Sequence, residues 1–569
     1  MLRRRPLGFL LLACNALSQQ TPLQSQVEAS TDSVAPFIFN GLSGLLTQWP
    51  NTVHGNGHSI VPGILHPFTL LYHGRQDAKL PPSPEWLAWD PEMSFAIMVP
   101  RGGETHLATY RTMQPANIVY FDGMSAAWGD GWLDSQHMFM YGVSPKDGKS
   151  TNWWDDYGRA AKLCDWAKPR DIDAIVRMNA GFQLRSELIW CDFDSPKLQL
   201  VSHLNITPPG TPERLPFPRF PHLLGVGDED DKDKEPPKQQ PPWRGPGREP
   251  GRRPGGGRGG GPGWSPVAEI AKTGNLEWVR AASHRAASPQ PHLTLFPSLM
   301  VTYYHPRLES VAAERTNKSM TNHRLTSISV ADAISVVEEV NDVVERFKAG
   351  DRGSGMDWTG TALGIIEYWG DRISHMHSLL LNASEPDANA TASLLAIRTL
   401  AYTLLNPYMQ PGIAPNASGW ELFFGMPAVA GFDGTVTAWE RCTRQKTDFL
   451  SHLADLRTTQ EILLQETIEI VLGRLCYDFG MIFAQSSDLV EGNPVDPFIH
   501  QWRIRVEQLM QWLDWSVWLR CEDVCPRDHV CTTPVWPIAW YVGGRVPGFP
   551  GSGDTDPDRL KPRCIRMAV

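Results

Sequence analysis

The chain has 569 residues, of which 41% are hydrophobic and 20% are charged, and its formal net charge is −10. This length is sufficient for two or more hydrophobic cores, and the composition is ordinary for a globular protein. The negative charge, spread over such a length, indicates solubility and argues against nucleic acid as a partner.

The N-terminus has the layout of a secretory signal peptide. A basic run, Arg3–Arg5, precedes an apolar stretch over 6–17, and polar residues follow from Ser18. We interpret 1–18 as a cleaved signal, because a helix that spans a bilayer needs roughly 20 apolar residues. No later apolar run is long enough to span either. We therefore expect a secreted protein, or one in the lumen of the secretory pathway, without a stable membrane anchor after cleavage.

Residues 19–207 form the first predicted structural part. Short runs rich in β-branched and aromatic residues are separated by Gly and Pro, which is typical of strands. The predicted strands include Phe68–His73, Phe95–Val99, Leu107–Tyr110 and Asn117–Phe121, and a helix is predicted over Trp153–Ala167. This part is therefore predicted to be strand-rich.

The composition changes sharply over 208–263, where 27 of 56 residues are Pro or Gly. Such a segment cannot bury enough apolar surface to offset the entropy lost on ordering. We predict a disordered linker or insertion. Its Arg/Gly run, Arg252–Gly259, resembles an RNA-binding tract, but a secreted protein meets little RNA.

Residues 264–569 are predicted to be mainly helical. Apolar residues recur at steps of three and four over Ser329–Lys348, where Ser329 can cap the helix and Gly350 ends it. Further helices are predicted at Trp358–Leu381, Thr391–Leu405, Thr459–Ala484 and Ile499–Trp518. The predicted fold class is α+β, with strands before the insertion and helices after it. The two parts form either one shared core or two.

Cysteine number supports the secretory interpretation. Removal of Cys14 with the signal leaves an even number, which favours disulfides in a secreted chain. The eight are Cys164, Cys191, Cys442, Cys476, Cys521, Cys525, Cys531 and Cys564. Their spacing suggests a Cys164–Cys191 bridge and a pairing within Cys521, Cys525 and Cys531, although eight cysteines allow 105 connectivities.

Five Asn-x-Ser/Thr acceptors predict N-glycosylation and surface positions. They are Asn205, Asn317, Asn382, Asn389 and Asn416.

Zinc bound by Cys521, Cys525, Cys531 and His529 is the alternative to disulfides in the C-terminal region. Cys-x3-Cys-x5-Cys is not a recurrent zinc spacing, and an oxidising compartment favours the bridges. We therefore expect no metal and no other cofactor.

Several strings together resemble a family of uncharacterised fungal secretory-pathway proteins. They are Asn56–Gly63, Leu71–Gly74, Glu85–Ser94, Tyr120–Gly123, Leu133–Gln136, Glu187–Asp192 and the tail from Cys521 to Pro537. The resemblance covers most of the chain outside the insertion. It implies a location but brings no established activity.

A strand ending in Leu71–Gly74, a Trp-containing strand through Ser94 and a third strand over Asn117–Asp122 resemble ADP-ribosyltransferase-like folds. In that family a His or Arg on the first strand grips NAD, and a Ser or Tyr on the second supports it. A late Glu stabilises the ribosyl cation that forms as nicotinamide leaves. The resemblance assigns His73 and Ser94 to the first two places. No late Glu motif follows, and Asp134-Ser135-Gln136 is the nearest substitute.

The candidate catalytic residues are thus His73, Ser94, Asp122 and Asp134, and whether the protein is an enzyme stays open. A carbohydrate-active protein is a second hypothesis, because 22 tryptophans could stack on sugars and many carboxylates lie near aromatics. These carboxylates are Glu85, Asp90, Glu92, Asp122, Asp134 and Asp192. The third hypothesis is a non-enzymatic surface or matrix protein with a glycan or protein ligand.

Overall fold

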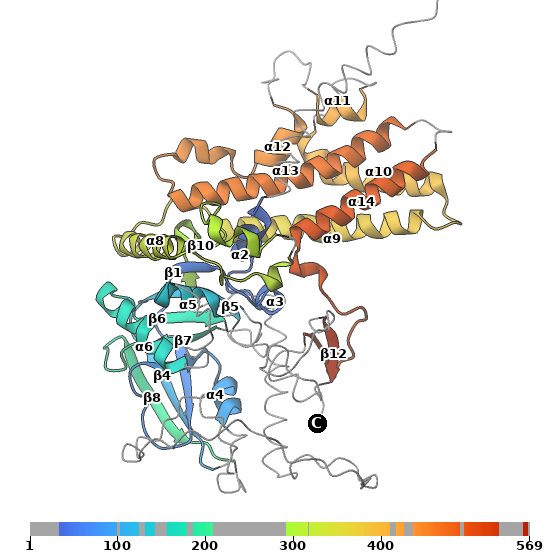
Figure 1. The fold of residues 1–569 in the computed structure, drawn as a ribbon. Helices are drawn as coiled ribbons and strands as arrows, with labels where there is room; N and C mark the ends of the chain where they lie inside the picture. Colours follow the sequence, from blue (N-terminus) through green and yellow to red (C-terminus); the bar gives the residue numbers. More distant parts are fainter. Residues whose placement is uncertain are drawn as a thin grey trace, which may run out of the picture.

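The computed structural model describes residues 33–98, 103–124, 131, 133–142, 156–178, 186–208, 292–316, 318–409, 417–425, 436–489, 494–533 and 561–566. The predicted signal peptide lies outside these residues, as does all but the first residue of the predicted insertion. The described elements stack in two layers, with the long helices on one side and the sheet on the other (Figure 1). The fold is α+β, as predicted.

The sheet has ten strands in the order β10-β1-β5-β6-β7-β3-β2-β4-β8, with β9 also paired to β1. Only the β5–β6 pair is parallel. The strands are β1 (Ser59–Leu65), β2 (Leu70–Arg75), β3 (Glu85–Ala88), β4 (His106–Thr112), β5 (Ala116–Met124), β6 (Ala174–Met178), β7 (Ser186–Trp190), β8 (Leu198–Asn205), β9 (Leu293–Leu295) and β10 (Val301–Thr302). The last two strands come from beyond the predicted insertion, so both parts of the chain build this sheet.

Several helices accompany the sheet and the N-terminal segment. They are α2 (Ala35–Ser43), α3 (Gln48–Val53), α4 (Pro91–Met98), α5 (Asp134–Tyr141) and α6 (Asp156–Ala167). Helix α6 confirms the predicted helix, within the described residues. Its Leu163 and Cys164 are buried against the sheet residues Ile175 and Ile189 in one apolar cluster.

The second layer consists of α8 (Val330–Lys348), α9 (Trp358–Ala383), α10 (Ala390–Leu405), α11 (Gly419–Phe423), α12 (Ala438–Arg444), α13 (Thr459–Asp488) and α14 (Asp496–Leu513). The predicted helices are confirmed. Ser329 caps α8 by accepting from the Asp332 amide, and Gly350 follows its end with a φ of +91°. Helix α14 stops earlier than predicted, because Asp514 takes a left-handed φ of +45°. A short 3-10 turn, η9 (Ser516–Trp518), covers the remainder.

The predicted strand at Phe95–Val99 is wrong, because residues 91–98 form helix α4 and Ser94 lies on it rather than on a strand. Pro91 at the first helical position and Glu92 in the first turn favour a helix start. The predicted strands in β2, β4 and β5 are confirmed within two residues at most boundaries.

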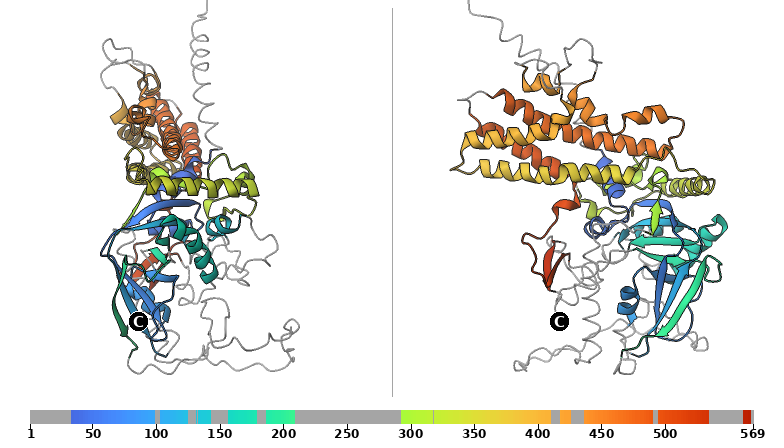
Figure 2. Two further views of the ribbon diagram at one scale, coloured as in Figure 1. Left: turned by 90° about the vertical axis from the view of Figure 1, so that its left-hand side faces the viewer. Right: turned by 180° about the vertical axis from the view of Figure 1, so that it is seen from behind.

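One apolar core joins the two layers. It contains Leu71 and Tyr120 from the sheet together with Trp369, Leu475 and Trp502 from the helices. Helix α2, close to the N-terminal end of the described chain, packs against α9 and α13 where the two layers meet (Figure 2). The segments on either side of the predicted insertion therefore share a core.

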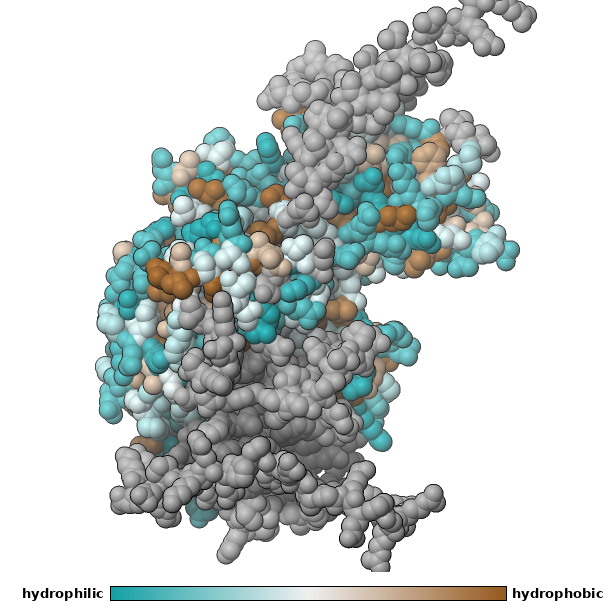
Figure 3. All heavy atoms as spheres, viewed as in Figure 1, coloured by the Kyte–Doolittle hydropathy of each residue, from teal (hydrophilic) through white to brown (hydrophobic). Residues whose placement is uncertain are grey.

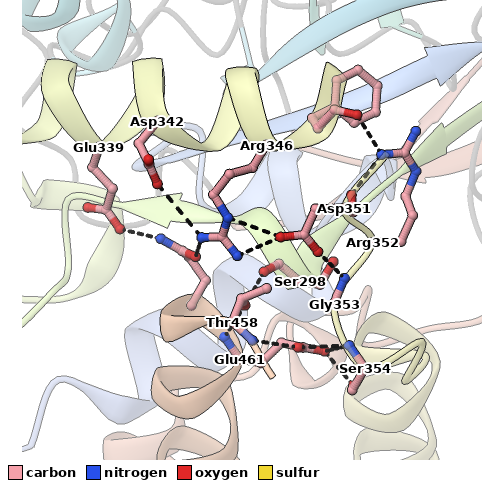
Figure 4. Close-up of polar contacts among 12 residues, drawn as sticks. Ser298, Glu339, Asp342, Arg346, Asp351, Arg352, Gly353, Ser354, Thr458 and Glu461 are labelled. Carbon is pink, nitrogen blue, oxygen red and sulfur yellow. Dashed lines mark hydrogen bonds and ion pairs between the residues drawn. The ribbon is translucent and has the colours of Figure 1, made fainter. Parts of the chain in front are cut away.

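Hydrogen bonds connect the N-terminal end of α13 to two neighbouring turns (Figure 4). The Glu461 carboxylate accepts from the Thr458 amide at 3.0 Å, the Ser354 amide at 3.0 Å and the Trp358 indole at 2.8 Å. The Thr458 hydroxyl donates to the carbonyl of Ser298, in the turn that follows β9. These bonds connect the helical layer to the sheet segment.

Four disulfides are formed by the eight cysteines: Cys164–Cys191, Cys442–Cys476, Cys521–Cys531 and Cys525–Cys564. The predicted Cys164–Cys191 bridge and a pairing within the C-terminal trio are confirmed. The last two bridges hold the hairpin of β11 (His529–Thr532) and β12 (Arg563–Arg566), which lies to one side of the sheet (Figure 1). No described helix is both long and apolar enough to span a membrane.

On the face shown in Figure 3, the coloured surface is mostly hydrophilic, with apolar side chains scattered over it. Among the predicted glycosylation sites, Asn205, Asn382 and Asn389 are exposed. Asn317 and Asn416 lie outside the described residues.

Candidate functional site

Three adjacent strands, β7, β3 and β2, form the centre of the candidate site. Tyr72 of β2 stands opposite Ala88 of β3, and Ala88 stands opposite Glu187 of β7. Arg177 of β6 continues the same row opposite Glu187. Because strands in a sheet are about 4.8 Å apart, the row places β2 and β7 about 10 Å from one another across β3.

His73 lies on β2, next to Tyr72, and its ring reaches β3. Its Nδ1 lies 2.7 Å from the Trp86 carbonyl oxygen, which can only accept, so Nδ1 carries the proton. Burial lowers the pKa of His73 to about 4. The imidazole is therefore neutral at physiological pH, and its Nε2 is a hydrogen-bond acceptor.

Glu187 on β7 is paired with Arg177 on the neighbouring strand β6. The Arg177 Nε lies against Glu187 Oε1, and both side chains are about nine-tenths buried. The Arg177 guanidinium also lies over the Trp86 ring, 4.0 Å from its centre. Trp86 thus contacts the arginine through its ring and His73 through its carbonyl. Because side chains alternate along a strand, Glu187 shares the face of Tyr72 and Ala88. His73 follows Tyr72 and therefore projects from the opposite face.

Ser94 is the second residue that the ADP-ribosyltransferase resemblance assigned. It connects α4 to β2. Its hydroxyl donates to the Tyr72 carbonyl at 3.1 Å. A Cβ on Gly74 would lie 2.3 Å from the Ser94 carbonyl oxygen, so α4 can approach β2 this closely only because residue 74 is glycine. In this structure Ser94 supports the strand that carries His73.

Further polar groups lie at the end of β3. Glu85 accepts from its neighbour's amide, Trp86, at 2.8 Å and from the Tyr157 hydroxyl at 3.4 Å. Burial raises the pKa of Glu85. The positive charge of the nearby Arg75 lowers this pKa, but by less than burial raises it. Arg75 is itself paired with Asp77 at 2.6 Å. This end of the site therefore carries charges of both signs.

The four predicted residues do not converge. Asp122 lies on β5, which is separated from β2 by β6, β7 and β3. Asp134 begins α5, where its carboxylate is fully buried and pairs with Arg324 at 2.9 Å. His73 and Ser94 therefore share one region of the sheet, and the two aspartates lie elsewhere. The pairing of Glu187 with Arg177 was missed because nothing local in these strings shows that β7 lies between β6 and β3.

Asp122 is buried, and burial raises its pKa to about 6. Its Oδ1 accepts from the Tyr120 hydroxyl at 3.0 Å, which partly offsets the burial. The backbone around it is tight, since a Cβ on Gly57 would lie 1.7 Å from the Asp122 carbonyl oxygen. The carboxyl is thus held in a closely packed polar region.

Several tryptophans in the part of the chain that the structure describes belong to the apolar core. Trp190, Trp358, Trp369, Trp502 and Trp515 are almost fully buried, and no described tryptophan is among the exposed large side chains. They act as core residues.

The cysteine sulfurs that come closest to a metal-site arrangement are those of Cys521, Cys525 and Cys564, all within 4.8 Å of one another. They belong to two adjacent disulfides, so no thiolate is available while the bridges are intact. His529 lies beside Asp528 instead, at 2.8 Å.

The fold and these strands define an α+β protein of which residues 96–220 match the family model described as the YPL277C N-terminal domain. The matched residues run from α4 through β8 and include Arg177 and Glu187, whereas β2 and β3 precede them.

Two proteins of Saccharomyces cerevisiae are similar to this chain. The uncharacterised protein YPL277C is 30% identical over 226 residues, which cover 32% of this chain and 45% of the relative. The uncharacterised protein YOR389W is 30% identical over 225 residues, which cover 32% of this chain and 35% of the relative. The similarity thus spans less than half of either relative and connects the chain to uncharacterised fungal proteins. No solved structure matches.

Proposed function

We propose that β2 and β3 bind NAD in the manner of ADP-ribosyltransferase-like proteins, on the face of the sheet that carries His73. The observation that carries the proposal is the register of these strands, which puts His73 on the face of Leu87 and Glu85. The resemblance places a histidine on the first strand, and His73 meets this requirement. It also places a glutamate late in the chain, which Glu187 does not supply, because Glu187 projects from the opposite face. The glutamate on the face of His73 is Glu85, close to Arg75.

The chemistry follows from the state of each side chain. The neutral His73 ring can accept a hydrogen bond from a ribose hydroxyl through Nε2. When the bond between the ribose carbon and the nicotinamide nitrogen breaks, the electron pair leaves with the nitrogen and neutral nicotinamide departs. The Glu85 carboxylate would stabilise the ribosyl cation that remains, and water would then add to it. The Tyr157 hydroxyl, which donates to Glu85, would hold that carboxylate in place.

Thermal unfolding in the presence of NAD tests the proposal. We expect NAD to raise the Tm of the wild-type protein in a saturable manner, and His73→Ala to abolish the shift. His377→Ala is the matched control, because His377 lies on α9 in the other layer and contacts Glu507 there. The alternative, a non-enzymatic surface protein with a glycan or protein ligand, predicts no shift with NAD in any of the three proteins.

We further propose that the protein works in the secretory pathway and is N-glycosylated. Four disulfides and the exposure of Asn205, Asn382 and Asn389 support this location. At Asn389 the Oδ1 caps α10, which leaves the Nδ2 for a glycan. Expression in a eukaryotic secretory host should give a protein whose mass falls on glycosidase treatment. A fully intracellular product with reduced cysteines would contradict the proposal.

A further inference from the structure

The C-terminal hairpin brings four cysteine sulfurs together. Cys531 of β11 stands directly opposite Cys564 of β12, and the side chains of such a cross-strand pair project from the same face. Cys521 and Cys525 lie in the loop before β11. Because Cys521 is bonded to Cys531 and Cys525 to Cys564, the two loop cysteines lie on the face of the strand pair. Two sulfurs thus come from the loop and two from the strands. We call these four residues the hairpin cysteines.

The sulfurs of the hairpin cysteines are close enough to surround one ion. Those of Cys521, Cys525 and Cys564 all lie within 4.8 Å of one another, although Cys521 belongs to a different bridge from the other two. The sulfur of Cys531 adjoins this group, because it is bonded to that of Cys521. Four thiolates at about 2.3 Å from a tetrahedral zinc ion are about 3.8 Å from one another. The three sulfurs therefore already lie near the spacing that zinc requires.

The two bridges of the hairpin differ from the other two in burial. Cys164, Cys191, Cys442 and Cys476 are at most 1% exposed, and each of these two bridges lies within an apolar cluster. The hairpin cysteines are only half-buried. Because thiol–disulfide exchange requires access to a sulfur atom, an external dithiol should open the hairpin bridges first. The buried bridges then keep both apolar clusters cross-linked while the hairpin sulfurs are free.

We propose that the hairpin is a redox-switched zinc site, in which the thiolates of Cys521, Cys525, Cys531 and Cys564 bind one Zn²⁺ after their bridges are reduced. At each bridge a thiolate of an external dithiol attacks one sulfur, and the bond between the two cysteine sulfurs breaks. The dithiol then closes to a cyclic disulfide, so two electrons pass to the protein and two thiols remain. Zinc displaces one proton from each of the four thiols. The ion thus replaces two covalent links between the loop and the strands.

Zinc titration of the full chain, before and after reduction, tests the proposal. The protein is treated with a dithiol, the dithiol is removed without air, and alkylation followed by mass spectrometry identifies the free cysteines. We expect the hairpin cysteines to be alkylated and the four buried cysteines to stay bridged. The reduced chain should bind one zinc ion, and the oxidised chain none, because only thiolates are zinc ligands. Co²⁺ in place of zinc should give absorption from thiolate-to-metal charge transfer.

Cys525→Ser combined with Cys564→Ser removes two of the four ligands and should weaken zinc binding by the reduced chain at least about 100-fold. His529→Ala is the control and should bind zinc like the wild type, because the His529 ring lies against Asp528 at 2.8 Å. If the double variant fails to fold, the titrations of the wild-type protein and of His529→Ala decide. The proposal is overturned if the reduced wild-type protein binds no zinc, if His529→Ala loses zinc, or if the dithiol opens a buried bridge first.

Discussion

The helical layer and the sheet layer treat their buried charges differently. In the helical layer the fully buried Asp478 lies between Arg474 at 2.6 Å and Arg505 at 2.7 Å. In the sheet layer Arg177 and Glu187 also form a buried pair. Arg315, however, pairs with no carboxylate of the described residues, and the pKa of Asp122 is raised because burial outweighs its hydrogen bonds. The buried Asp478 of the helices is thus fully compensated, whereas the sheet layer combines compensated pairs with buried polar groups that destabilise the fold when charged.

The largest effect is expected in the helical layer. Asp478→Ala leaves two arginines without their shared carboxylate, and the loss of one partner of a buried ion pair costs about 3–5 kcal/mol. Urea denaturation should show this decrease in the free energy of unfolding. Glu338→Gln, on an exposed position of α8, is the control and should change the free energy little. A decrease of less than about 1 kcal/mol in the free energy of unfolding of Asp478→Ala would contradict the difference between the two layers.

Asp122 in the sheet layer should behave in the opposite way. Its pKa is about 6 in the folded protein and 3.8 as the ordinary value, so the fold favours the protonated form. Stability from this group is complete below about pH 4 and is lost as the pH rises through 6. Asp122→Asn should therefore be more stable than the wild type at pH 8, by at most about 3 kcal/mol, and equal to it near pH 4.

Urea denaturation at both pH values measures this difference. Asp192→Asn serves as the control, because Asp192 is exposed. A wild-type protein that exceeds Asp122→Asn in stability at pH 8 would show that the carboxylate is compensated after all.

The contact between α4 and β2 gives a third prediction. Gly74→Ala places a Cβ 2.3 Å from the Ser94 carbonyl oxygen, so α4 must move away from β2. Overpacking of this kind costs about 1–3 kcal/mol. Chemical denaturation measures the cost, and NAD-dependent thermal shift should weaken in parallel, because the His73 strand loses its support. Unchanged stability would mean that α4 does not rest on β2.

The smallest effect again belongs to the helical layer and has the opposite sign. A Cβ on Gly364, in the middle of α9, would meet nothing within 4 Å. Gly364→Ala should therefore stabilise the protein by about 0.5–1 kcal/mol, because alanine has the higher helix propensity. Thermal unfolding measures the gain. A destabilised variant would indicate that α9 packs more closely at this position than the structure shows.

The helical layer could be predicted from the sequence because its signals are local. The apolar residues of α8 recur along one face, Ser329 caps it and Gly350 follows it, all within one window. The strands β2, β4 and β5 were also recognisable, but their neighbours were not. Strand β3 lies between β2 and β7, whose residues are more than 100 positions apart in the chain, and no local pattern encodes that pairing.

The candidate site was predictable only in part for the same reason. The resemblance identified His73 from its own string, and the structure adds the carbonyl of Trp86 that sets its tautomer. Glu85 was recognised only as one of several carboxylates near aromatic residues, because no local pattern shows that it shares a face with His73. Helix α4 was mistaken for a strand because Phe95 and Val99 suggested β structure, whereas Pro91 and Glu92 direct a helix start.

The decisive measurement is the release of nicotinamide from NAD by the wild-type protein and by Glu85→Gln. We predict that the wild-type protein binds NAD and releases nicotinamide. We predict that Glu85→Gln binds NAD with similar affinity but releases nicotinamide at least 100-fold more slowly, as expected when a group that stabilises transition-state charge is lost. Equal rates for the two proteins, or no binding of NAD by the wild type, would contradict it.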